Sequence, residues 1–114
     1  MSARHFTWHL TPAAYWRKAD RDEPYRPEAF EEDGFIHCTD GEERAAEVGN
    51  RYYRDDTRPY VALLIDLGRL TSPWRYADDE HVYPHIYGPL NRDAIVGAYP
   101  MPCSKDGTFA PPRH

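Results

Sequence analysis

Three of the six histidines in the chain occupy similar settings, and imidazole is the side chain that most often moves protons near neutral pH. His9 and His37 each lie in a short strand-like run, while His85 shares a third segment with Tyr87. If the faces carrying these side chains converge, they form a cleft suited to a flat heteroaromatic ring and a ribose, through stacking and hydroxyl hydrogen bonds. The alternative is that each histidine is structural and bonded to a backbone carbonyl.

The stretch around His37 predicts a strand that runs directly into a helix. Strand alternation places Phe35 and His37 on one face and Ile36 on the other. Thr39, followed three residues later by Glu42, predicts a capping box at the helix start. A strand that ends beside a helix N-terminus is a suitable place to hold an anion or a polar ligand.

Cys38 raises the alternative of a cysteine nucleophile, because it follows His37 and precedes the expected helix, whose dipole lowers a thiol pKa. However, alternation places Cys38 on the same face as Ile36, which favours a buried, inert thiol. A disulfide between Cys38 and Cys103 is a weaker alternative.

A metal-dependent hydrolase is a further alternative. His81 and His85 have the spacing that zinc enzymes use on helices, and Asp79 or Glu80 could supply a third ligand. Pro84 lies between the two histidines and opposes a helix there. The signal for a metal is therefore weak.

The composition narrows the class of protein. A length of 114 residues predicts one domain, with an ordered core over about 6–99 and a Pro-rich C-terminal arm over 100–114. The net charge of −5 argues against a nucleic-acid partner held through its phosphates. No apolar run is long enough to cross a membrane, and residues 1–5 lack the apolar core of a signal peptide. The two cysteines show no CxxC spacing, which is typical of reduced thiols in the cytoplasm.

Periodicity predicts an α+β domain with a mixed or mostly antiparallel sheet in two halves and two helices early in the chain. Thr11 and Pro12 are expected to begin the first helix, and Tyr60–Asp66 is expected to be a central strand buried on both faces. The prolines and glycine of Tyr83–Leu90 predict an edge segment or an ordered loop rather than an interior strand. Further elements are expected at residues 6–10, 40–53, 74–76 and 94–99.

Several of these strings together resemble the bacterial domain-of-unknown-function family 952, over about Phe6 to Tyr99. The strings are Trp8-His9-Leu10-Thr11, Gly34-Phe35-Ile36-His37-Cys38-Thr39, Asn50-Arg51-Tyr52-Tyr53, Leu64-Ile65-Asp66 and Tyr83-Pro84-His85-Ile86-Tyr87-Gly88-Pro89-Leu90. The fold of that family is similar to the ADP-ribosylation fold. The resemblance therefore implies an ADP-ribosylation-like fold and a cleft for NAD or a related nucleotide.

In ADP-ribosyl enzymes, a first-strand histidine holds a ribose hydroxyl and a second-strand residue stacks near the nicotinamide ribose. His9 and His37 match these positions, and His85 with Tyr87 would close the reacting end. The cofactor-binding residues implied are His9, Thr11, His37, Thr39 and Arg51, with Arg51 expected at a phosphate.

The third motif of those enzymes is usually a glutamate that stabilises an oxocarbenium-like transition state. The corresponding segment here, Tyr83–Leu90, contains no carboxylate. Losing such a group can cost several orders of magnitude in rate. The resemblance therefore implies either ADP-ribosyl or N-glycosidic transfer or hydrolysis, or a non-catalytic nucleotide-binding module. The acceptor and the oligomeric state are left open.

Overall fold

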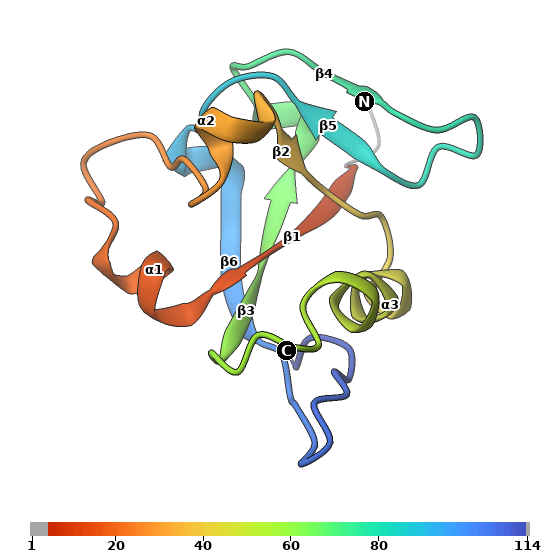
Figure 1. The fold of residues 1–114 in the computed structure, drawn as a ribbon. Coiled ribbons are helices and arrows are strands. Elements are labelled where there is room, and N and C mark those ends of the chain that lie inside the picture. The colour runs from red at the N-terminus through yellow and green to blue at the C-terminus, as the bar shows by residue number, and fades with distance from the viewer. Residues whose placement is uncertain (1–4, 114) are drawn as a thin grey trace.

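The computed structural model describes residues 5–113, and its strands form two three-stranded antiparallel sheets (Figure 1). The first sheet has the order β1-β3-β6 and the second the order β2-β5-β4. The strands are β1 (Phe6–Pro12), β2 (Ile36–His37), β3 (Tyr60–Asp66), β4 (Trp74–Tyr76), β5 (Pro84–Ile86) and β6 (Ile95–Pro100). This arrangement confirms the α+β class and the sheet in two halves.

The helices are short and lie around the first sheet. They are α1 (Ala13–Lys18), α2 (Phe30–Asp33) and α3 (Glu42–Tyr52), with single 3₁₀ turns at η1 (Leu67–Arg69) and η2 (Arg92–Ala94). In Figure 1, α1 and α3 lie on opposite sides of the β1-β3-β6 sheet, and α2 lies beside β2. None of the helices in residues 5–113 is long and apolar enough to span a membrane.

Strand β3 is the centre of the first sheet and contributes to two apolar clusters. Tyr60 and Ala62 pack with Trp8 beneath α3, whereas Leu63 and Ile65 belong to the second cluster. Because side chains alternate along a strand, one seven-residue element supplies both clusters. The prediction of a central strand buried on both faces is confirmed.

The two sheets meet where β1 passes the chain after β2. Trp8 and Thr39 exchange backbone hydrogen bonds of 2.9 and 2.8 Å. The amide of Cys38 donates to the carbonyl of Pro84 at 3.0 Å, so the same segment is also bonded to β5. We call this junction the seam, and the histidines predicted to act together lie around it.

Segment Tyr83–Leu90 corrects the prediction of an edge or loop, because β5 is the interior strand of the second sheet. Pro84 is tolerated because it is the first residue of the strand, where a missing N–H does not interrupt the ladder. Gly88 and Pro89 lie beyond the last paired residue, Ile86. The prolines therefore bound this strand and do not exclude it.

Both predicted helix caps are wrong. Thr11 belongs to β1, and the first helix begins at Ala13 after Pro12. Thr39 pairs with Trp8 in an extended conformation, so the later helix starts at Glu42 with Gly41 as its N-cap. At both positions the backbone of the threonine is paired with another segment, and this pairing excludes the helix N-cap that the local sequence favours.

The segment after β6 packs back onto α3. Phe109 is buried, and Asn50 fixes its backbone by accepting from its amide at 2.7 Å and donating to its carbonyl at 3.2 Å. A β-carbon placed on Gly49 would lie 3.0 Å from the Phe109 ring, so the close approach requires glycine. Residues 101–109 thus cover the apolar face of α3.

Candidate functional site

A large cleft lies between α2, α3 and the second sheet, with a volume of about 860 Å³. We call it the main cleft. Its polar and aromatic lining residues include Asp33, His37, Thr39, Arg51, Tyr53 and His85. The cleft therefore contains four of the residues predicted to bind a cofactor or catalyse: His37, Thr39, Arg51 and His85.

His37 and His85 lie next to each other on paired strands, with ring centroids 5.4 Å apart. The ring of Phe35 stacks on His85 with centroids 4.0 Å apart and also contacts His37 at 4.5 Å. Ile36, on the opposite face, is fully buried. The predicted division of faces is confirmed, and it directs both imidazoles towards the same side of the second sheet.

Asp33 orients His37. The Nε2–H of His37 donates to Asp33 Oδ2 at 3.0 Å, and both side chains remain partly exposed to the cleft. A carboxylate that accepts from one ring nitrogen leaves the lone pair of the other nitrogen available in the neutral imidazole. Burial, together with the nearby charge of His37, lowers the pKa of His85 from 6.5, which favours a neutral ring there.

His9 lies behind this pair and not in the main cleft. Its Nδ1–H donates to the carbonyl of His37 at 2.6 Å, and the side chain is only 6% exposed. Burial, the largest cause, lowers the pKa of His9 from 6.5 to about 4. His9 is therefore a neutral imidazole at pH 7 that fixes β1 to the backbone of His37.

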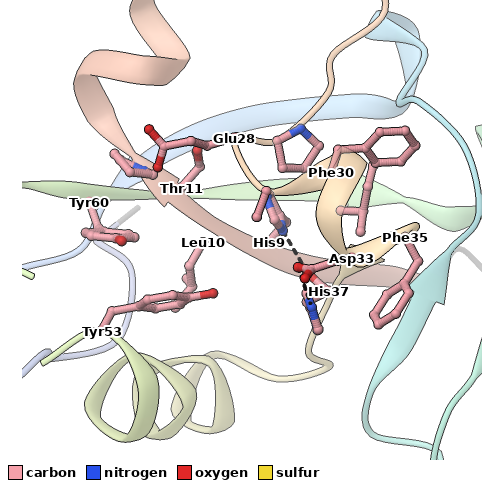
Figure 2. Close-up of a pocket in the computed structure, with 14 residues that line it drawn as sticks. His9, Leu10, Thr11, Glu28, Phe30, Asp33, Phe35, His37, Tyr53 and Tyr60 are labelled. Carbon is pink, nitrogen blue, oxygen red and sulfur yellow. Dashed lines mark hydrogen bonds and ion pairs between the residues drawn. The ribbon is translucent and has the colours of Figure 1, made fainter.

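Figure 2 shows a second, smaller space on the β1 side of His37, with a volume of about 90 Å³. We call it the side pocket. It is lined by His9, Thr11, Phe30 and Tyr60, and it shares Ala29, Asp33, His37 and Tyr53 with the main cleft. In Figure 2, dashed lines join His9 to the backbone carbonyl of His37 and the His37 ring to the Asp33 carboxylate. His37 and Asp33 thus separate two adjoining spaces.

The remaining predicted site residues, Thr11 and Tyr87, do not line the main cleft. The Thr11 hydroxyl lies 2.7 Å from the Tyr25 hydroxyl inside the protein. Tyr87 lines neither space, and its hydroxyl accepts a hydrogen bond of 3.4 Å from Arg75 Nε. Its ring centroid is 5.9 Å from that of Phe35, so Tyr87 extends the aromatic surface beside His85.

Cys38 is buried, and burial raises the pKa of its thiol. Both cysteines are free, and Cys103 is exposed. A thiol reagent added to the native protein is therefore expected to modify Cys103 rapidly and Cys38 only after denaturant is added. Titration with a chromogenic disulfide, with Cys103→Ser as the control, measures this difference. Rapid modification of the Cys103→Ser variant would restore the nucleophile hypothesis.

The predicted metal ligands do not gather. His81 stacks on Tyr76 with ring centroids 4.7 Å apart, whereas His85 stacks on Phe35. Within residues 5–113, no group of three or more His, Cys, Asp or Glu side chains could hold a metal ion. The donor set required by a metal-dependent hydrolase does not fit the described chain.

Two contributors to the site were missed from the sequence. Asp33 is not among the residues predicted for the site, but α2 and the left-handed Gly34 after it carry its carboxylate back to His37. Tyr53 is also absent from the predicted site residues, yet it lines both spaces. The only signal for Asp33 was the glycine that follows it, which marks a sharp change of direction.

The α+β fold and its two sheets recur in a solved structure. The crystal structure of protein CC0527 from Caulobacter crescentus matches this chain with a TM-score of 0.74 at 21% sequence identity. The match covers 93% of this chain and 94% of that chain. A double mutant of the same protein matches at 20% identity with the same TM-score. At this identity the likeness concerns the fold.

The family is shown by the sequence itself. Residues 10–98 match the model of the family described as "Protein of unknown function (DUF952)". This protein therefore belongs to the DUF952 family, as the resemblance in the sequence indicated. No curated protein is significantly similar to it.

Proposed function

We propose that the main cleft binds NAD or a related nucleotide, and that the domain has an ADP-ribosylation-like fold. The observation that carries the proposal is the adjoining pair of imidazoles in a cleft of about 860 Å³. A space of this size, with aromatic walls and a few convergent polar groups, suits a ligand with a flat ring and a ribose.

In this proposal His37 and His85 face the ring and its ribose. Thr39 lies on the cleft wall, and Tyr87 extends the stacking surface. Arg51 is the one lysine or arginine among the cleft's lining residues in the described chain, so it is the phosphate contact we propose. His9 and Thr11 bound the adjoining side pocket, where a smaller group of the ligand would enter.

The charges of the cleft predict an order of affinity. Asp33, Glu47 and Asp78 line it together with Arg51, so a diphosphate meets more negative charge than positive. NAD carries a cationic pyridinium ring that such carboxylates attract, whereas ADP-ribose lacks it. We therefore expect NAD to bind more tightly than ADP-ribose, and AMP to show whether one phosphate suffices.

The chemistry we propose for an active enzyme is ADP-ribosyl or N-glycosidic transfer or hydrolysis. His37, positioned by Asp33, would accept or donate a proton, and the neutral His85 beside it would hold a hydroxyl. The alternative is a non-catalytic nucleotide-binding module. This alternative is favoured by the absence of a carboxylate in segment Tyr83–Leu90 and by the hydrogen bond that already engages Asp33.

Isothermal titration with NAD, ADP-ribose and AMP tests binding directly. A heat of binding on addition of NAD supports the proposal. An assay for released nicotinamide then distinguishes an enzyme from a non-catalytic binding module. The absence of heat with all three ligands, at protein concentrations that detect millimolar dissociation constants, would refute it.

Replacing Arg51 with alanine is expected to weaken NAD binding about tenfold, because one charge-assisted contact to phosphate is lost. The matched control is Arg44→Ala, which removes an exposed arginine from the same helix outside the cleft. Titration of both variants with NAD measures the effect. Equal affinities for the two variants would exclude Arg51 as the phosphate contact.

A further inference from the structure

One residue in the wall of the side pocket has a buried polar atom whose hydrogen-bonding capacity is unused. His9 Nε2 is buried and has no hydrogen-bond partner in the described chain. The other nitrogen, Nδ1, must carry the proton because it donates to the carbonyl of His37. Nε2 of the neutral ring is therefore a hydrogen-bond acceptor without a donor, at a residue that lines the pocket.

Most other polar groups around the pocket are already engaged. Thr11, Glu28, Asp33 and Tyr60 each bond to another side chain. The Tyr53 hydroxyl forms no hydrogen bond within residues 5–113, although its ring stacks on Tyr60 with centroids 5.1 Å apart. Burial, followed by the charge of Asp33, raises the pKa of Tyr53, which keeps the phenol protonated and able to donate.

We propose that the side pocket binds the primary carboxamide of an aromatic ligand, its NH₂ donating to His9 Nε2 and its carbonyl accepting from the Tyr53 hydroxyl. The inference rests on the nucleotide-binding function proposed above and names the part of the ligand that enters this space. The carboxamide's ring would then lie towards Phe35 and the shared wall of His37.

Three properties of the pocket select a carboxamide over related groups. A volume of about 90 Å³ is several times what one water molecule requires, which accommodates a three-atom planar group. The carboxylate of Asp33 lines the same space and repels the carboxylate form of an acid. A ketone supplies the carbonyl but has no N–H for His9, so the buried acceptor stays unpaired.

The experiment compares three pyridines that differ in one group: nicotinamide, 3-acetylpyridine and nicotinic acid. Binding to the full chain is followed by NMR, including the ring nitrogen resonances of His9. Nicotinamide is expected to bind about fivefold more tightly than 3-acetylpyridine, and nicotinic acid is expected to bind most weakly. A chemical-shift change of His9 Nε2 that occurs with nicotinamide and not with the other two pyridines would show directly that Nε2 accepts the hydrogen bond.

A pair of tyrosine variants tests the second contact. Tyr53→Phe removes the proposed donor but keeps the ring, and is expected to weaken nicotinamide binding about fivefold. Tyr60→Phe is the matched control, because its hydroxyl donates to Asp56 and is not free for a ligand. Circular dichroism of both variants establishes that they are folded.

The outcomes separate this inference from the proposed function. If NAD binds but the three pyridines bind equally, or Tyr53→Phe behaves like Tyr60→Phe, the carboxamide subsite is overturned and the nucleotide cleft stands. If nicotinamide binds more tightly than the other two pyridines and NAD does not bind, the carboxamide subsite is supported and the proposed nucleotide-binding function is refuted. Tightest binding of nicotinic acid would overturn the subsite.

Discussion

Acidification from pH 6.5 to pH 4 is expected to lower the free energy of unfolding by about 3 kcal/mol through His9 alone. Burial lowers the folded-state pKa of His9 to about 4, while the unfolded chain keeps a value near 6.5. Between these values the unfolded state binds a proton and the folded state does not, so stability falls as the pH falls. Well above pH 6.5 His9 is neutral in both states and its contribution is constant.

Urea unfolding at pH steps between about 7 and 4 measures this slope. The comparison is His9→Gln, which cannot titrate in that window and is expected to show a flatter profile. His85, whose pKa burial also lowers, contributes a slope of the same sign in both proteins, whereas the lowered pKa values of Asp56, Asp78 and Asp106 act near the unfolded value of 3.8, below most of the window. Parallel profiles for His9→Gln and the wild type would contradict the assignment.

Replacing Leu63 with alanine is expected to destabilise the protein by about 3 kcal/mol. Leu63 is fully buried in the central strand β3, paired with His9 on one side and Ala98 on the other. Truncation leaves a cavity between two sheets that cannot easily close, because both neighbouring strands are fixed by the ladder.

The matched control is Val96→Ala, in the same sheet but half exposed. Its expected change is within about 0.5 kcal/mol, since little apolar area is lost. Urea unfolding of both variants at one pH gives the two values. A loss below about 1 kcal/mol for Leu63→Ala would show that this part of the sheet repacks around the cavity.

Hydrophobic patterning predicted the strands whose own residues indicate which of their faces are buried. The apolar run Tyr60–Asp66 could only be a buried strand, and it is β3. Alternation placed Phe35 and His37 opposite Ile36, which is how the structure has them. The features that sequence reasoning missed depend on pairing between segments far apart in the chain.

Thr39 illustrates this limit. Local chemistry favoured a helix cap, but its backbone pairs with Trp8, which lies 31 positions earlier in the numbering. Pro84 likewise suggested an edge, although its place at the start of β5 makes it harmless. Neither pairing leaves a periodic signal, so local propensity was overridden by tertiary contacts.

The site was predicted in part for the same reason. His37 and His85 were expected to meet, and they do because β2 and β5 pair at those two residues. His9 was expected on the same surface, but the close approach of β1 turns its ring towards the backbone of His37. The role of Asp33 depends on the reversal at Gly34, and that glycine is the only sign of it in the sequence.

The position of His37 and Asp33 between two spaces has a mechanical consequence. The main cleft is walled by the second sheet and two helices, whereas β1 and Tyr60 of β3 wall the side pocket. A molecule long enough to occupy both spaces would contact both sheets. It would hold the sheets together at the seam, which few backbone hydrogen bonds cross. The affinity for such a molecule and the rigidity of the domain would then rise together. Substitutions along the seam would change the affinity without contacting the molecule.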